Sequence, residues 1–180
     1  MVKALVILAD GFEEMEAITP IDLLRRAGID VLVLGLGKKQ VRSARGVEIV
    51  ADDIFDSKKD YADFEAIILP GGPGTEKLLA DNGVINCVKD FYKNEKLCCA
   101  ICAAPKVFDK AGILEKRQFT CFPPVKKDIK SGKYIDDAVV QDENILTSKA
   151  AGTAIDFSLV IIDNLLDEDA AREVIDKIYY

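Results

Sequence analysis

Cys102 is the residue of this chain whose local sequence best suits nucleophilic chemistry. It ends an apolar run that begins at Leu97, and small residues separate it from Pro105, where a helical pattern starts. A strand that turns sharply into a helix presents a side chain above the carboxyl edge of a parallel sheet. The helix N-terminus favours negative charge, so we expect Cys102 to be partly thiolate near neutral pH. Because the glycines of a G-x-S-x-G elbow are absent, a small buried thiol is the alternative interpretation.

Two other loops are expected at the same sheet edge. The first, 10–16, follows an apolar run and contains Glu13, Glu14 and Glu16. From the residues alone, each glutamate is equally well explained as a first-turn carboxylate favoured by the helix dipole. The second is Pro70-Gly71-Gly72, which follows another apolar run. It either lets backbone amides approach an oxyanion closely or forms a simple turn.

The chain contains no histidine, which excludes a Ser-His-Asp triad, a Cys-His dyad within one chain and zinc sites that need imidazole. Its cysteines are odd in number, which favours reduced thiols over a disulfide framework. They are Cys87, Cys98, Cys99, Cys102 and Cys121. The spacing of Cys98 and Cys102 could suggest metal ligands, but both lie on an expected buried strand whose side chains alternate between faces. We therefore expect no metal site.

Length and composition are typical of a globular protein. The 180 residues suit a full core, and we expect a single domain over 1–180. A net charge of -7 and a pI near 4.8 argue against nonspecific binding to nucleic acid or to an anionic membrane. Acidic residues directly follow the apolar start, which predicts a first strand and not a signal peptide. No apolar run approaches membrane-spanning length, so we expect a cytoplasmic protein.

Apolar runs and helical patterns alternate along the chain. Strands are expected at 3–9, 29–36, 47–50, 65–70, 97–102 and 119–121, with a hairpin formed by 139–141 and 144–148. Helices are expected at 13–27, at 76–96 in two pieces split at Asn82-Gly83, at 105–111, at 152–166 and from 168 onward. A turn is expected at 37–40, and a loop or short helix at 56–63 and 126–130. Pro20 lies too far inside the first helix to be a first-turn residue, so we expect a kink or a restart there.

This alternation predicts an α/β fold with a mostly parallel sheet, helices on both faces and right-handed crossovers. In such folds the ligand site lies outside the carboxyl ends of the strands, where the strand order reverses. The loop 10–16, the turn at 70–72 and Cys102 all reach that edge. We therefore expect these three segments to form one site.

A series of motifs lies in order along nearly the whole chain: ADGFEEME at 9–16, SARGV at 43–47, LPGG at 69–72, AICAAP at 100–105, LTS at 146–148 and GTA at 152–154. Together they resemble the ThiJ/PfpI family, also called the DJ-one superfamily, and specifically its DJ-one-like branch. The resemblance implies a flavodoxin-like three-layer sandwich with a cysteine nucleophile elbow. It also implies a homodimer, the usual state in this family.

The same resemblance implies roles for individual residues. Cys102 would be the reactive cysteine, and Glu16 would be protonated and hydrogen-bonded to its sulfur. Arg45 would lie near the dimer interface and the active site. An oxyanion pocket would be lined by backbone amides near Gly71, Gly72 and Ala103. Chemically, burial and the like charge of a thiolate keep a neighbouring carboxylic acid neutral, so it can donate this hydrogen bond.

The sequence departs from the family pattern at two places. Proteases of the wider family place a histidine directly after the nucleophile, where this chain has Ala103, so we do not expect a protease. Several members carry another histidine near the pocket, where this chain has Cys121 or Phe122. Cys121 could act as a resolving thiol, although a buried structural thiol is the preferred interpretation. Any general base must then be Glu16 or water.

The expected function is a cofactor-independent enzyme that acts on reactive aldehydes. It would hydrate glyoxal or methylglyoxal to a hydroxy acid, as a glyoxalase III does, or release early glycation adducts, as a deglycase does. The alternative is a redox-sensing or oxidative-stress protein, or a chaperone, whose Cys102 oxidises to a sulfinate. A third possibility is a binding domain with an inert Cys102. The expected partners are a small aldehyde or glycated adduct and a second copy of the chain, without nucleic acid or membrane.

Overall fold

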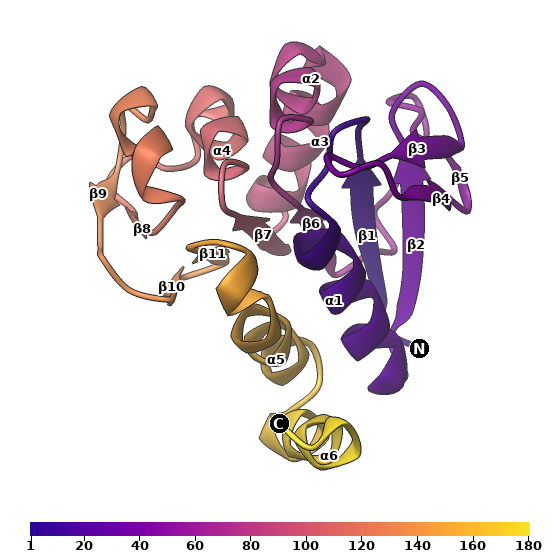
Figure 1. The fold of residues 1–180 in the computed structure, drawn as a ribbon. Coiled ribbons are helices and arrows are strands. Elements are labelled where there is room, and N and C mark those ends of the chain that lie inside the picture. The colour runs from indigo at the N-terminus through magenta and orange to yellow at the C-terminus, as the bar shows by residue number, and fades with distance from the viewer.

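The computed structural model describes residues 1–180 and has a seven-stranded sheet at its centre (Figure 1). The strand order is β10-β11-β7-β6-β1-β2-β5. Every neighbouring pair is parallel except the antiparallel β10 and β11. The strands are β1 (Lys3–Leu8), β2 (Asp30–Gly35), β5 (Asp53–Ile54), β6 (Ala66–Leu69), β7 (Leu97–Ile101), β10 (Val139–Asp142) and β11 (Ile145–Ser148). The order of β2, β1, β6, β7 and β11 is that of flavodoxin-like folds, as predicted.

Helices cover both faces of this sheet, and Figure 1 shows α2, α3 and α4 on one side and α1, α5 and α6 on the other. They are α1 (Glu14–Arg26), α2 (Thr75–Ala80), α3 (Asn82–Lys93), α4 (Pro105–Ala111), α5 (Ala154–Leu165) and α6 (Glu168–Ile178). Two short 3-10 helices, η1 (Pro123–Asp128) and η2 (Ala151–Thr153), lie in the later loops. None of the helices combines the length and the apolar character that crossing a lipid bilayer requires.

The apolar run of β1 explains why the sheet is covered on both faces. Its side chains alternate between two separate core clusters. Ala4, Val6 and Leu8 pack with α1, α5 and α6, whereas Leu5 and Ile7 pack with α2, α3 and α4. A continuous apolar run is what a strand buried on both sides requires. The predicted three-layer arrangement is therefore confirmed.

The structure differs from the sequence predictions in local detail. α1 continues through Pro20 without a restart. Its apolar residues on both sides of Pro20, including Ala17 and Leu24, are buried in one core cluster, and this packing keeps the helix in one piece. The sequence also failed to indicate several two- or three-residue strands, which have no usable periodicity. These are β5, β3 (Gln40–Arg42), which pairs with β4 (Glu48–Val50), and β9 (Lys133–Tyr134), which pairs with β8 (Gln118–Phe119).

Candidate active site

Cys102 follows β7 directly and adopts a left-handed backbone conformation, with φ of 64°. Few residues other than glycine adopt this region, which costs about 1–3 kcal/mol. Two hydrogen bonds hold the strained residue in place. Its backbone N–H donates to the carbonyl oxygen of Ser148 at 2.9 Å, and its own carbonyl oxygen accepts from Phe122 N–H at 2.8 Å. With α4 beginning at Pro105, this is the sharp strand-to-helix turn that the sequence predicts.

Gly71 lies where the first and third predicted segments meet. A Cβ atom added to Gly71 would lie 2.7 Å from Cys102 Cβ, 2.7 Å from Glu16 Oε2 and 2.9 Å from the backbone nitrogen of Ala103. No real Cβ tolerates such contacts. Glycine is therefore required because the elbow and the Glu16 side chain both pack against its backbone. The structure thus brings Glu16, Gly71 and Cys102 together, as the sequence predicts.

Glu16 is buried, with 1% of its surface exposed, in the first turn of α1. Its Oε2 atom accepts a hydrogen bond from the backbone N–H of Gly71 at 2.9 Å. Burial raises the pKa of this carboxyl group to about 7, and the negative charge of Glu13 adds to the increase. Hydrogen bonds from Cys102 and from the backbone amides of Gly71 and Ala151 partly oppose it. Near neutral pH Glu16 is therefore poised to give or accept a proton.

The surroundings of the Cys102 thiol oppose the thiolate that the sequence predicts, and its ionisation stays a prediction. Burial raises the pKa of the thiol to about 12, and the charge of Glu16 and the hydrogen bond with Glu16 contribute to the increase. The backbone amides of Gly72 and Ala103 lower the pKa but do not outweigh burial. The Cys102 thiol and the Glu16 carboxyl group are coupled, so the loss of one proton leaves a single negative charge that the two groups share. Transfer of the thiol proton to Glu16 would give a thiolate and a carboxylic acid with no change in net charge.

Gly72 and Ala103 place two backbone amides beside the sulfur, as the oxyanion prediction requires. Gly72 has φ of +85°, and a Cβ there would lie 2.6 Å from Gly11 O and 2.7 Å from Glu13 N. Glycine is therefore needed both for the conformation and for the close approach of the loop before α1. The same amides could stabilise negative charge that develops on an oxygen bound next to the sulfur.

Arg45 contacts the beginning of α1, not the Cys102–Glu16 pair itself. Its backbone N–H donates to Glu14 Oε1 at 2.7 Å, and its Nη1 atom lies 3.3 Å from Glu13 Oε1 and 3.4 Å from Glu14 Oε2. The side chain is 71% exposed. Arg45 therefore reaches the site only through the glutamates that precede Glu16. Its place near a dimer interface stays a prediction.

The last residue of β11 and the residues after it complete the site in a way that sequence reasoning missed. The Ala151 amide interacts with the Glu16 carboxylate, and Ser148 anchors the elbow through its carbonyl oxygen. Thr153 Oγ1 lies 2.6 Å from Ser148 Oγ and donates to Ala150 O at 2.8 Å, which fixes the turn between them. The motifs LTS at 146–148 and GTA at 152–154 were the available signal, but their spacing does not indicate which backbone atoms face the site.

Cys121 is fully buried among the apolar side chains that pack with α2, α3 and α4. Burial raises the pKa of its thiol to about 11. These features agree with a structural thiol.

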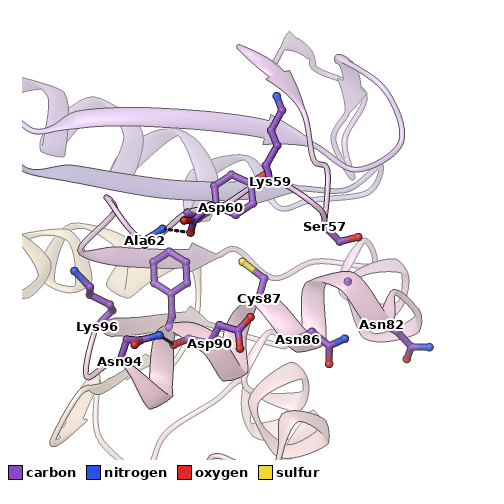
Figure 2. Close-up of a pocket in the computed structure, with 13 residues that line it drawn as sticks. Ser57, Lys59, Asp60, Ala62, Asn82, Asn86, Cys87, Asp90, Asn94 and Lys96 are labelled. Carbon is purple, nitrogen blue, oxygen red and sulfur yellow. Dashed lines mark hydrogen bonds between the residues drawn. The ribbon is translucent and has the colours of Figure 1, made fainter.

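A separate pocket of about 660 Å³ lies between the loop before β6 and α3, and Figure 2 shows Cys87 in its wall. None of the residues predicted for the site lines that pocket.

Comparison with known proteins identifies the family. A model of the DJ-1/PfpI family matches residues 2–164. The chain belongs to the DJ-1/PfpI family. Within this family it is 37% identical to the Parkinson disease protein 7 homolog of Danio rerio over 177 residues, which cover 96% of this chain and 94% of that protein. The resemblance to the DJ-1-like branch is thereby confirmed.

Two further DJ-1/PfpI relatives bear on function and fold. The chain is 39% identical to the glutathione-independent glyoxalase DJR-1.2 of Caenorhabditis elegans over 166 residues, 91% of this chain and 88% of that protein. The crystal structure of the DJ-1 superfamily protein STM1931 from Salmonella typhimurium matches with a TM-score of 0.95 and 38% identity, covering 100% of this chain and 99% of that chain. The fold described above is therefore the DJ-1 fold.

Proposed function

We propose that this protein is a cofactor-independent glyoxalase that converts methylglyoxal or glyoxal to the corresponding hydroxy acid. The observation that carries the proposal is the packing of Glu16 and Cys102 against Gly71 at the carboxyl edge of the sheet. The activity named for the Caenorhabditis elegans relative supports the same substrate class. Early glycation adducts, which a deglycase would release, are a second substrate class for the same thiol chemistry.

The first step is addition of the Cys102 sulfur to the aldehyde carbon. Glu16 accepts the thiol proton as the carbon–sulfur bond forms, and its pKa of about 7 suits a general base near neutral pH. The aldehyde oxygen becomes negatively charged, faces the amides of Gly72 and Ala103, and takes that proton back from Glu16 to give a hemithioacetal.

The second step moves a proton between the two carbons of the bound aldehyde. Glu16 removes the proton from the carbon attached to sulfur and returns it to the neighbouring carbon. The hydroxyl proton on the first carbon passes to the carbonyl oxygen of the second. The first carbon is thereby oxidised to a thioester and the second reduced to an alcohol, so no external oxidant or reductant is needed. Water then cleaves the thioester, which releases lactate from methylglyoxal and restores the thiol.

The direct test measures lactate formation from methylglyoxal by the full chain. The Cys102→Ser and Glu16→Gln variants should both lose activity, the latter by about 10²–10⁴-fold because general acid–base catalysis contributes that much. Cys87→Ser, in the wall of the separate pocket, is the matched control and should retain the wild-type rate. A wild-type rate no higher than that of Cys102→Ser would exclude the proposal.

A reaction in deuterium oxide tests the role of Glu16. A carboxyl group that carries the proton exchanges it with solvent, so lactate should contain deuterium at C2 when analysed by NMR. Full retention of hydrogen at C2, together with undiminished lactate formation by Glu16→Gln, would exclude Glu16 as the proton carrier.

A second candidate function is redox sensing through Cys102. Its side chain is partly exposed, whereas the other four cysteines are buried. The amides of Gly72 and Ala103 and the carboxyl group of Glu16 could hold the oxygens of a sulfinate. After mild peroxide treatment, mass spectrometry should find oxidation at Cys102 before any other cysteine. Earlier oxidation of Cys87 or Cys121 would exclude this role.

We also propose that the protein forms a homodimer, as the family resemblance implies. Exposed apolar side chains on α1 and on the β3–β4 hairpin support this proposal, since such residues are favoured at interfaces. They are Met15, Ile18, Val47 and Val50. Sedimentation of the wild type and of Val50→Lys tests it, and a monomeric wild type would exclude it.

A further inference from the structure

Glu13 is tied to the same backbone elements as Glu16. Its Oε2 atom caps α1 by accepting the backbone N–H of Glu16 at 2.9 Å. Its own backbone N–H donates to the carbonyl oxygen of Gly71 at 3.0 Å, next to the Gly71 N–H that binds Glu16. The Glu13 side chain is 13% exposed. Its carboxylate is therefore held close to the proposed proton carrier in a partly buried position.

Arg45 is held beside Glu13 by the loop between β3 and β4. Ala44 N–H donates to Phe12 O at 2.8 Å, and Ser43 Oγ bonds to Glu14 Oε1 at 2.5 Å, which fastens this loop to the start of α1. The single guanidinium group of Arg45 lies within 3.4 Å of carboxylate oxygens of both Glu13 and Glu14. Since two carboxylates share it, the charge of Glu13 is only partly compensated.

The other groups that hydrogen-bond to Glu16 and shift its pKa are a thiol and two backbone amides. The elbow contributes the Cys102 thiol, the turn after β6 contributes the Gly71 amide, and the segment before α5 contributes the Ala151 amide. The negative charge of Glu13 raises the pKa of the Glu16 carboxyl group. Like charge disfavours the ionised form, and an added cation offsets that effect.

We propose that Glu13 and Arg45 are positioning residues of the Cys102–Glu16 pair. The negative charge of Glu13 disfavours negative charge on the pair, and the positive charge of Arg45 weakens this effect. Through these two residues the loop between β3 and β4 sets the pH range in which Glu16 can act as a base. The role in catalysis rests on the proposed function. The effect of Glu13 and Arg45 on the titration of Glu16 does not depend on any substrate.

The test follows the Glu16 carboxyl resonance by carbon-13 NMR during a pH titration, and Glu16→Gln identifies the signal. Glu13→Gln removes the charge but keeps an oxygen that can accept the Glu16 N–H. It should lower the titration midpoint by about half a pH unit or more. Arg45→Gln should raise the midpoint, because Glu13 and Glu14 then lose their cation. A purely structural role would not produce shifts of opposite sign.

The Glu168–Arg172 pair on α6 provides matched controls. It is an exposed glutamate–arginine ion pair on a different helix, so Glu168→Gln and Arg172→Gln should leave the midpoint unchanged. An unchanged midpoint in Glu13→Gln, or no increase in Arg45→Gln, would overturn the proposal. Because the titration contains no aldehyde, a failed glyoxalase assay with opposite shifts would reject the proposed function alone.

Discussion

Glu16 Oε2 accepts a hydrogen bond from the backbone N–H of Gly71 at 2.9 Å, which joins the first turn of α1 to the end of β6. The two residues are 55 positions apart in the chain. Gly71 has no side chain, so its backbone can lie against both the Glu16 carboxyl group and Cys102. This contact decides where the acid of the site is placed.

Gly71→Ala tests the importance of that close packing. The new methyl group would lie 2.7 Å from both Cys102 Cβ and Glu16 Oε2, so the elbow or the acid must move. We expect a loss of about 1–3 kcal/mol in the free energy of unfolding, as for other overpacked sites. Lactate formation should fall by about 100-fold, since a displacement near 1 Å can have that effect. Urea unfolding and the lactate assay measure the two effects.

Gly152→Ala is the control for this substitution. Gly152 lies in η2, close to the site in sequence, but a Cβ there would meet no atom within 4 Å. Its stability and activity should equal those of the wild type. Equal behaviour of the two alanine variants would contradict the packing argument.

The raised pKa of Glu16 predicts a pH dependence of stability. The folded state keeps the proton up to a pKa of about 7, whereas the carboxyl group normally titrates near 4.5. Between these pH values the folded state binds more protons, so stability falls as pH rises through this window. The unfolding free energy of the wild type minus that of Glu16→Gln should therefore fall by about 3 kcal/mol from pH 4 to pH 8. Parallel pH profiles in urea unfolding would show that Glu16 titrates normally.

The accessibility of the thiols predicts an order of alkylation. Cys102 is partly exposed, Cys87 is 8% exposed, and Cys98, Cys99 and Cys121 are 0% exposed. Iodoacetamide should therefore label Cys102 first in the folded protein, with rates that increase with pH as the pair loses protons. Peptide mass spectrometry over time checks the order. Labelling of Cys98 or Cys99 before Cys102 would contradict the described burial.

Thr153 provides a test of the turn that sequence reasoning missed. Thr153→Val removes the hydroxyl group that bonds to Ser148 Oγ and Ala150 O. Loss of hydrogen bonds in this setting should lower the free energy of unfolding by about 1–3 kcal/mol. The Glu16 carboxyl group should also titrate at a higher pH, because the Ala151 amide is no longer held against it. Thr153→Ser retains the hydroxyl group and should keep both properties close to those of the wild type. Wild-type stability and Glu16 titration in Thr153→Val would contradict a role for the hydroxyl group.

Much of the fold follows from local patterns in the sequence. The apolar runs at β1, β6 and β7 indicate strands covered on both faces, and the intervening helical patterns require parallel connections. The place of the site follows from the same logic, because the carboxyl ends of parallel strands meet at one edge. Short strands such as β5 have too few residues for a periodic signal, and they form because a longer neighbour offers its hydrogen-bonding edge.

The choice of Glu16 among three glutamates illustrates the limit of local information. Glu13, Glu14 and Glu16 share one turn, and composition and spacing give none of them a distinct role. In the structure Glu13 caps the helix, Glu14 binds the loop at Ser43, and Glu16 faces inward to Gly71. Helix rotation relative to the sheet separates these three roles, and this rotation is set by packing against residues distant in sequence.

The amino-acid sequence by itself determined the longer strands, the elbow at Cys102 and the edge at which the site lies, because these depend on periodicity and chain direction. The tertiary structure decided the surroundings in which the pair titrates. Burial beside Glu16 raises the pKa of the Cys102 thiol, although the sequence predicted a lowered value from the helix N-terminus. Desolvation and charge act through space, so they depend on neighbours that come together only when the chain is folded.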